Sequence, residues 1–444
     1  MLTKERFMMI SSDCHASPMA TTYRDYLEGR YLSELNAAVK QQEATIAADR
    51  AFAATKTKSL ASQPVGQRFD QRFSRDYDQR RIYATDLSSR LDQIAEDGWV
   101  GELVFPDNSV GNSIPFTGAF FGDAGDADRD QYCAILRAYN RWLGETSTPD
   151  RQLGVALVPL HDPEYAVEQV KLARRLGLRG VMPQWDGFDP SFRPLYDPAF
   201  DAFWAACADE GLPVSFHSHV GLPKAAAAAA VGRHDAVHDA GRQQRAVAWA
   251  ILGTEYLFWG RRPLWHLILG GVLERHPRLS VGFVEMYADW VPRTLDFLDF
   301  KWKVGKFDVK DLCPKLPSEY WRRQCWVGSH VTSVGEAQQF KECEYGIETV
   351  TYGTDFPHPN SPWGVTREAL RASIGLAGVS ENETRLILGE NLARIYKVDV
   401  AKLVPIVERI GPLPEEILDV TEGEDVTIGL DDYLIANTRR RNTV

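Results

Sequence analysis

The sequence lacks long apolar runs, with no stretch of about 18 consecutive apolar residues that could form a membrane-spanning helix. Its first residues also lack the apolar segment of a secretory signal. Basic residues are in the minority, at 50 Lys and Arg against 61 Asp and Glu, and they form no stripe interleaved with aromatics. A net charge of −11 argues against a nucleic acid or an anionic membrane as partner. We therefore expect a cytoplasmic protein.

Several chemical signatures are also missing. The six cysteines are scattered without C-x-x-C spacing, so neither a thiolate zinc site nor a disulfide framework is indicated. No G-x-S-x-G, no P-loop and no G-x-G-x-x-G after a strand occurs, which argues against a serine hydrolase, a nucleotidase and a Rossmann enzyme. The chemistry must be sought among histidines and carboxylates.

Eight short apolar runs are the main positive feature of the chain. Such runs are typical of parallel strands buried on both faces, and 44% hydrophobic residues supply an ample core. Five of the eight runs end on Asp or His, as expected for a barrel whose active site lies at the carboxyl ends of its strands. The runs are Phe7–His15, Glu102–Asp107, Leu153–Leu160, Gly177–Trp185, Leu212–His219, Leu279–Met286, Gln324–His330 and Thr349–Asp355.

Segments with helical periodicity alternate with these runs, which predicts parallel βα units and an α/β fold, a (β/α)8 TIM barrel. We expect the barrel to span residues 1–399, with long insertions at 23–86 after the first strand and 220–244 after the fifth. Residues 400–444 are expected to form a C-terminal extension. The helical segments are Leu87–Asp97, Asp128–Glu145, Pro163–Leu176, Asp197–Glu210, Gln243–His276, Asp289–Lys303, Val334–Tyr345 and Thr366–Leu376.

Metal-binding residue types gather at the predicted strand ends. Asp13 and His15 are two residues apart on the first strand, so their side chains share one face and can converge on one cation. His217 and His219 repeat this spacing on the fifth strand. Asp355 ends the last strand and can ligate a metal, act as a base, or do both. These residues predict a cage of His and Asp side chains from different strands.

The motifs together resemble the amidohydrolase superfamily, in the amidohydrolase-2 branch that includes aminocarboxymuconate-semialdehyde decarboxylase. The resemblance covers roughly Met8 to Tyr396. It implies that Asp13, His15, His217 and Asp355 hold one divalent metal, which can be zinc, manganese or iron. The motifs are ISSDCHASP, the HSH of the fifth strand, FVEMYADWVPRTLDFLD, YGTDFPHP and LGENLARIY.

The sequence departs from the family at two positions. Glu285 stands where the decarboxylases of this family place a substrate-contacting histidine after the sixth strand. The end of the fourth strand, Met182–Trp185, has no lysine, which removes the carbamylated bridge of many binuclear members. We therefore expect a single metal that activates water, with Asp355 or Glu285 moving the proton.

More ligands are present than one metal needs. His219, Glu285 and His330 are the best candidates for a second metal, and His219 is also a candidate catalytic residue. Two irons would permit the monooxygenase chemistry that a few similar proteins of secondary metabolism carry out. The alternative is that these residues orient the ligands of a single metal. Asp107, Trp185 and His358 are expected to line the substrate pocket.

These features order the functions that we expect. Metal-dependent hydrolysis of a small, apolar or aromatic molecule comes first. Non-oxidative decarboxylation of an aromatic or unsaturated acid is second, and a non-heme diiron monooxygenase is third. A binding protein on a degenerate barrel is the alternative without catalysis, but it predicts a broken ligand set, and the set is intact. The long insertions and the tail favour a homodimer.

Overall fold

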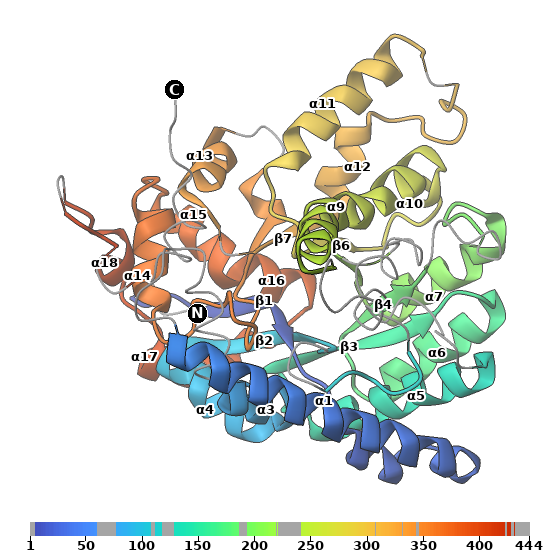
Figure 1. Ribbon diagram of the computed structural model, residues 1–444. Helices are drawn as coiled ribbons and strands as arrows, with labels where there is room; N and C mark the ends of the chain where they lie inside the picture. Colours follow the sequence, from blue (N-terminus) through green and yellow to red (C-terminus); the bar gives the residue numbers. More distant parts are fainter. Residues whose placement is uncertain are drawn as a thin grey trace.

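Eight parallel strands lie at the centre of the molecule in chain order, β1 to β8 (Figure 1). The computed structural model describes residues 5–59, 77–107, 112–117, 128–185, 193–218, 220, 241–306, 308–330, 332–342, 346–421, 424–427 and 430. All eight predicted strands are confirmed. They are β1 (Met9–His15), β2 (Trp99–Phe105), β3 (Gln152–Pro159), β4 (Gly180–Gln184), β5 (Val214–His217), β6 (Val281–Val284), β7 (Cys325–His330) and β8 (Val350–Gly353).

The sheet closes on itself where β8 meets β1. The Asp355 amide donates to the Asp13 carbonyl (2.8 Å), and the His15 amide donates to the Phe356 carbonyl (2.7 Å). Gly353 is required at this seam, because a Cβ there would lie 2.6 Å from Cβ of Asp13. The predicted α/β architecture, a (β/α)8 TIM barrel, is therefore confirmed, and its seam brings Asp13 and Asp355 together.

The surrounding helices begin where the sequence supplies caps. Asp86, Asp128 and Asp162 each accept backbone amide hydrogen bonds at the start of a helix, and Pro163 stands in the first turn that follows Asp162. The helices that match predicted segments are α4 (Leu87–Glu96), α5 (Arg129–Thr146), α6 (Pro163–Arg175), α7 (Asp201–Glu210), α11 (Trp290–Lys303), α13 (Val334–Glu342) and α14 (Thr366–Leu370).

The helices of the structure differ from the predicted ones at two places. The segment Gln243–His276 is not one helix, because α9 (Gly241–Leu269) ends before Gly271, which has φ of +74° and separates it from α10 (Val272–Arg275). Helix α12 (Pro317–Gln324) was not predicted, although Pro317 in its first turn and Glu319 bonding back to the Leu316 amide are sequence signals for a helix start.

The insertion after β1 forms η1 (Ala20–Asp25), η2 (Gly29–Tyr31), α1 (Leu32–Ser59) and α3 (Tyr77–Thr85), while the insertion after β5 lies almost entirely outside the described residues. At the other end of the barrel, the Phe7 amide donates to the Pro412 carbonyl (2.8 Å), which anchors the C-terminal segment. The remaining elements are η5 (Pro198–Phe200), η6 (Ile347–Thr349), η7 (Arg371–Gly375), α15 (Glu381–Arg385), η8 (Leu386–Glu390), α16 (Asn391–Ile395), α17 (Val400–Ile410) and α18 (Pro414–Leu418).

The hydrophobicity of the helices and the surroundings of the cysteines are defined for the described residues. None of the helices that they form combines the length and the hydrophobicity needed to cross a bilayer. The cysteines of the described part of the chain are buried and form no disulfide with one another: Cys14, Cys133, Cys207, Cys313 and Cys325.

Candidate metal centre

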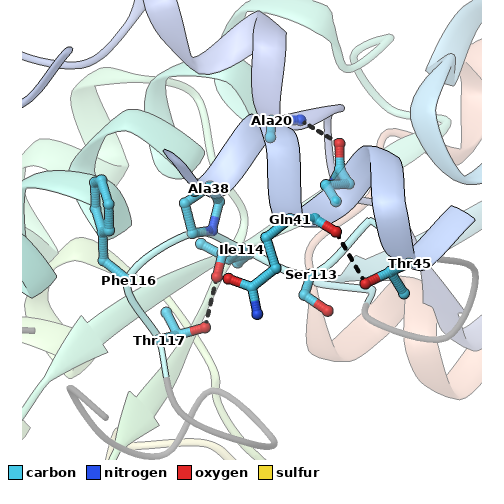
Figure 2. Close-up of a pocket in the computed structure, with 10 residues that line it drawn as sticks. Ala20, Ala38, Gln41, Thr45, Ser113, Ile114, Phe116 and Thr117 are labelled. Carbon is cyan, nitrogen blue, oxygen red and sulfur yellow. Dashed lines mark hydrogen bonds between the residues drawn. The ribbon is translucent and has the colours of Figure 1, made fainter. Parts of the chain in front are cut away.

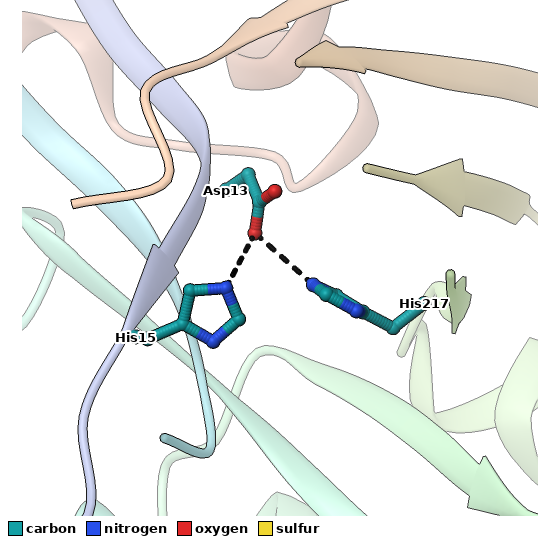
Figure 3. Close-up of side chains that lie close together, drawn as sticks. All are labelled: Asp13, His15 and His217. Carbon is teal, nitrogen blue, oxygen red and sulfur yellow. Dashed lines mark hydrogen bonds and ion pairs between the residues drawn. The ribbon is translucent and has the colours of Figure 1, made fainter. Parts of the chain in front are cut away.

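Three of the predicted ligands converge at the carboxyl ends of β1 and β5 (Figure 3). Oδ1 of Asp13 lies 3.3 Å from Nε2 of His15 and 3.3 Å from Nε2 of His217. All three side chains are buried, at 5% exposure or less. A carboxylate and two imidazoles in this arrangement can hold a divalent cation.

The trio is the centre of a longer chain in which carboxylates and imidazoles alternate. From Asp13 the chain passes through His15 to Asp355 (2.9 Å), then to His358 (2.7 Å) and Asp107 (3.2 Å). In the other direction it passes through His217 to Glu285 (3.3 Å). The strand ends therefore bring together seven residues, all of them predicted to lie in or near the site: Glu285, His217, Asp13, His15, Asp355, His358 and Asp107.

The hydrogen bonds of His15 define which atom can bind a metal. Its Nδ1 lies 2.7 Å from the Pro106 carbonyl, an acceptor, so Nδ1 carries the proton and Nε2 is the ligand atom. Two possible ligand groups, one with Asp13 and His217 and one with Asp355 and His358, share this single nitrogen. Nε2 of His15 lies 3.3 Å from Asp13 and 2.9 Å from Asp355, so the two groups adjoin at one imidazole. The donor set therefore fits one divalent metal.

Neighbouring charges shift the pKa values of two members of this row of carboxylates and imidazoles. Burial raises the pKa of Asp13, but His217 and His15 more than compensate and hold it well below its ordinary value. Burial lowers the pKa of His358, yet Asp355 and Asp107 outweigh burial and the neighbouring His15, and raise it to about 9. The rings of His15 and His358 are stacked, with centroids 4.1 Å apart. The carboxylates thus attract positive charge strongly to this position.

Glu285, which stands where family decarboxylases have a histidine, lies behind His217. Its carboxylate contacts Nδ1 of His217, the ring nitrogen that faces away from Asp13, and accepts a hydrogen bond from Ser218. This is the arrangement of a carboxylate that orients a metal-binding imidazole. Glu285 and Asp355 both have left-handed backbone conformations, with φ of +58° and +57°. Such conformations are uncommon for these residue types and cluster at functional sites.

The structure describes the side chains of two further predicted site residues, Asp107 and Trp185. Asp107 is buried behind His358 and contacts its Nε2, so it orients this histidine. The Trp185 indole donates to the Arg193 carbonyl (3.0 Å) and packs edge-on against His266 of α9. His219 lies outside the described residues, and His330 ends β7 with a side chain that the structure does not describe. Their proposed roles stay predictions.

Sequence reasoning missed two buried arginines beside the centre. Arg80 of α3 donates to the carbonyls of Pro357 and His358, and Arg90 of α4 donates to the carbonyl of His15. No motif marks either residue, because both lie in charged, helix-forming sequence like that of an ordinary surface.

A buried glutamate lies at the ends of the neighbouring strands β6 and β7. Glu336 accepts hydrogen bonds from the Ala288 amide, after β6, and from the Ser329 hydroxyl of β7 (2.8 Å). Burial raises its pKa to about 7 from an ordinary value of 4.5. The folded protein therefore binds a proton more tightly at this residue than the unfolded chain does.

We expect the free energy of unfolding to fall between about pH 4.5 and 7, by on the order of 2 to 3 kcal/mol from Glu336. Below about pH 4.5 Glu336 is protonated in both the folded and the unfolded state. Above about pH 7 its contribution to the free energy of unfolding is lost. Glu336→Gln should flatten this part of the pH profile in urea titrations. The exposed Glu408 offers a control, as Glu408→Gln should leave the profile unchanged. An equal slope for Glu336→Gln and the parent would contradict the assignment.

A cavity of about 160 Å³ lies between the insertion after β1 and the segment after β2 (Figure 2). Gln42 in its wall accepts a hydrogen bond from the Ala20 amide (2.8 Å). The opposite wall is Ser113–Thr117, and the preceding Asn112 donates to the Ser17 carbonyl. The Ser17 hydroxyl in turn accepts a hydrogen bond from the Asp107 amide (2.8 Å), so side-chain to backbone hydrogen bonds connect this wall to Asp107.

The chain is similar to known proteins over much of its length. The family model described as amidohydrolase matches residues 118–398, more than half of the chain. Gamma-resorcylate decarboxylase of Rhizobium sp. (strain MTP-10005) is 23% identical over 295 residues, 62% of this chain and 79% of that protein. The homologous enzyme of Rhizobium radiobacter is 25% identical over 296 residues, 61% of this chain and 79% of that protein.

Solved structures show the same fold. 5-Carboxyvanillate decarboxylase from Sphingomonas paucimobilis superposes with a TM-score of 0.56 at 19% identity, over 88% of this chain and 99% of that one. Dihydroxybenzoic acid decarboxylase from Polaromonas sp. JS666, solved with bound manganese and the inhibitor 2-nitroresorcinol, superposes with a TM-score of 0.57 at 14% identity. The superposition covers 89% of this chain and 99% of that one. The chain therefore belongs to the amidohydrolase family, in its amidohydrolase-2 branch.

Proposed function

We propose that this protein is a metal-dependent lyase that removes the carboxyl group of an aromatic or unsaturated acid without oxidation. The observation that carries the proposal is the buried chain of alternating carboxylates and imidazoles, with Asp355 between two histidines. The similar proteins are aromatic acid decarboxylases by name, which favours this reaction over the hydrolysis expected first. Enzymatic hydrolysis and a diiron reaction have no comparable support.

Asp13, His15, His217 and Asp355 are the residues that would hold the metal. When bound, a divalent cation supplies positive charge that orients and stabilises an anionic substrate. Manganese is the first ion to test, because it is bound in a structurally similar decarboxylase. Binding of a second ion by His219, Glu285 and His330 stays a prediction.

The chain's own residues would manage the proton. Decarboxylation breaks the bond between the carboxyl carbon and the ring, and the electron pair stays on the ring carbon, which must then take up a proton. Asp355 is the group best placed to deliver it, because it contacts Nδ1 of His358 (2.7 Å), an imidazole that can pass it a proton in turn. Asp107 holds His358 in position for this transfer.

The test uses the full-length protein, stripped of metal and reloaded with Mn²⁺. It is incubated with a panel of hydroxybenzoates that includes 2,6-dihydroxybenzoate and 5-carboxyvanillate, and with aryl esters and lactones. We expect CO2 release from at least one acid, dependent on Mn²⁺, and no turnover of the esters or lactones. Hydrolysis of the esters without CO2 release from any acid would instead support the hydrolase. The homodimer stays a prediction that the same preparation can test by light scattering.

A further inference from the structure

Three consecutive carbonyls after Asp355 accept hydrogen bonds from two arginines. Arg90 donates to Phe356 (3.3 Å), and Arg80 donates to Pro357 and His358. Both arginines have 0% exposure. Burying a guanidinium is costly unless it is paired and hydrogen-bonded, so such contacts indicate a specific structural demand at this turn.

Arg90 also reaches the other side of the barrel seam. It donates to the carbonyl of the ligand His15 (2.6 Å) and forms an ion pair with Glu102 (2.7 Å), which is equally buried. Gln152 donates to the second oxygen of Glu102 (2.9 Å), so the carboxylate that anchors Arg90 is itself held in place. One guanidinium thus joins the end of β1 to the turn that follows Asp355.

The turn that carries Asp355 needs stabilising contacts from the residues around it. Asp355 has φ of +57°, a conformation that costs a residue other than glycine about 1 to 3 kcal/mol and persists only where the surroundings impose it. The carbonyls of Pro357 and His358 point at Arg80. The guanidinium planes also lie over neighbouring aromatic rings, Arg90 over Phe356 (5.0 Å) and Arg80 over Trp363 (5.4 Å).

We propose that Arg80 and Arg90 are positioning residues of the metal centre. They hold Asp355 and His358 in place relative to His15, so that the ligands from β1 and β8 are spaced for one cation. The inference rests on the metal site of the proposed function. It gives α3, the last helix of the insertion after β1, and α4, the barrel helix that follows it, the role of supporting the turn that carries Asp355.

Lysine is the informative replacement at both positions. It keeps the positive charge but offers a single ammonium in place of the planar fork that reaches several acceptors at once. Residues that orient metal ligands typically change metal affinity by about 10- to 100-fold when replaced. Arg80→Lys and Arg90→Lys should therefore each weaken Mn²⁺ binding by about that factor.

Arg179 provides a matched control at the opposite end of the barrel. It lies just before β4 and also donates to two consecutive carbonyls, Tyr396 (2.6 Å) and Lys397 (3.2 Å). Arg179→Lys therefore removes a similar backbone contact far from the ligands. It should leave Mn²⁺ affinity at the parent value, whatever its effect on thermal stability.

The measurement is calorimetric titration of Mn²⁺ into metal-free full-length protein, with the melting temperature recorded for each variant. Parent-like affinity in Arg80→Lys would overturn the proposal, as would equal weakening in Arg179→Lys. If Arg90→Lys does not fold, Arg80→Lys decides, because it leaves the Arg90–Glu102 pair intact. No substrate is involved, so failure of the positioning role is distinct from failure of the acid panel that tests the lyase.

Discussion

Asp355→Asn is expected to lower kcat by about 100- to 10,000-fold while the protein remains folded. Asparagine has the shape of aspartate and tolerates the left-handed backbone conformation at this position, so the turn should persist. The amide cannot carry the proton that Asp355 would exchange with His358 (2.7 Å). The measurement is CO2 release at saturating Mn²⁺, with circular dichroism to confirm the fold.

Asp201→Asn is a suitable control for this loss. Asp201 also contacts a histidine, His276 (3.2 Å), and pairs with Arg275, but it lies at the start of α7, away from the cluster. This variant should retain parent turnover. A parent-like rate in Asp355→Asn would remove Asp355 from the proton transfer, and with it the mechanism proposed for decarboxylation.

The strands could be predicted from the sequence because strands buried on both faces leave an apolar pattern that survives without any tertiary information. The candidate residues followed from one rule, that the strands of a barrel end at a common face. Asp13, His15 and His217 lie close together for that reason, while the assignment of these three and Asp355 as the ligands of one metal came from the family resemblance and stays a prediction. The rule places residues at a face, and it does not determine which of them contact each other.

The orientation of Glu285 and the partners of His358 could not be read from the chain. Glu285 lies behind His217 and has a backbone φ of +58°, a conformation that no residue pattern there signals. His358 was predicted to line a pocket, and its contact with Asp107 joins residues that are 251 positions apart in the sequence. Arg80 and Arg90 were missed for the same reason, since their partners lie far along the sequence.

Asp13→Asn should have the largest effect on metal binding, because Oδ1 of Asp13 is the atom that both His15 and His217 approach. Removing one partner from a buried group of charges typically costs about 3 to 5 kcal/mol, so we expect Mn²⁺ affinity to fall by at least about a hundredfold. Titration of Mn²⁺ into the metal-free variant measures this loss. Asp299→Asn, a buried aspartate that accepts hydrogen bonds from Ser318, should bind Mn²⁺ like the parent.

The two aspartates should respond differently to excess metal. If Asp13 acts by holding the cation, high Mn²⁺ should restore part of the turnover of Asp13→Asn, because mass action refills a weakened site. Asp355→Asn should stay inactive at any Mn²⁺ concentration, because refilling the site does not replace a proton carrier. Recovery of both variants would reduce Asp355 to a ligand, and recovery of neither would show that Asp13 does more than bind the cation.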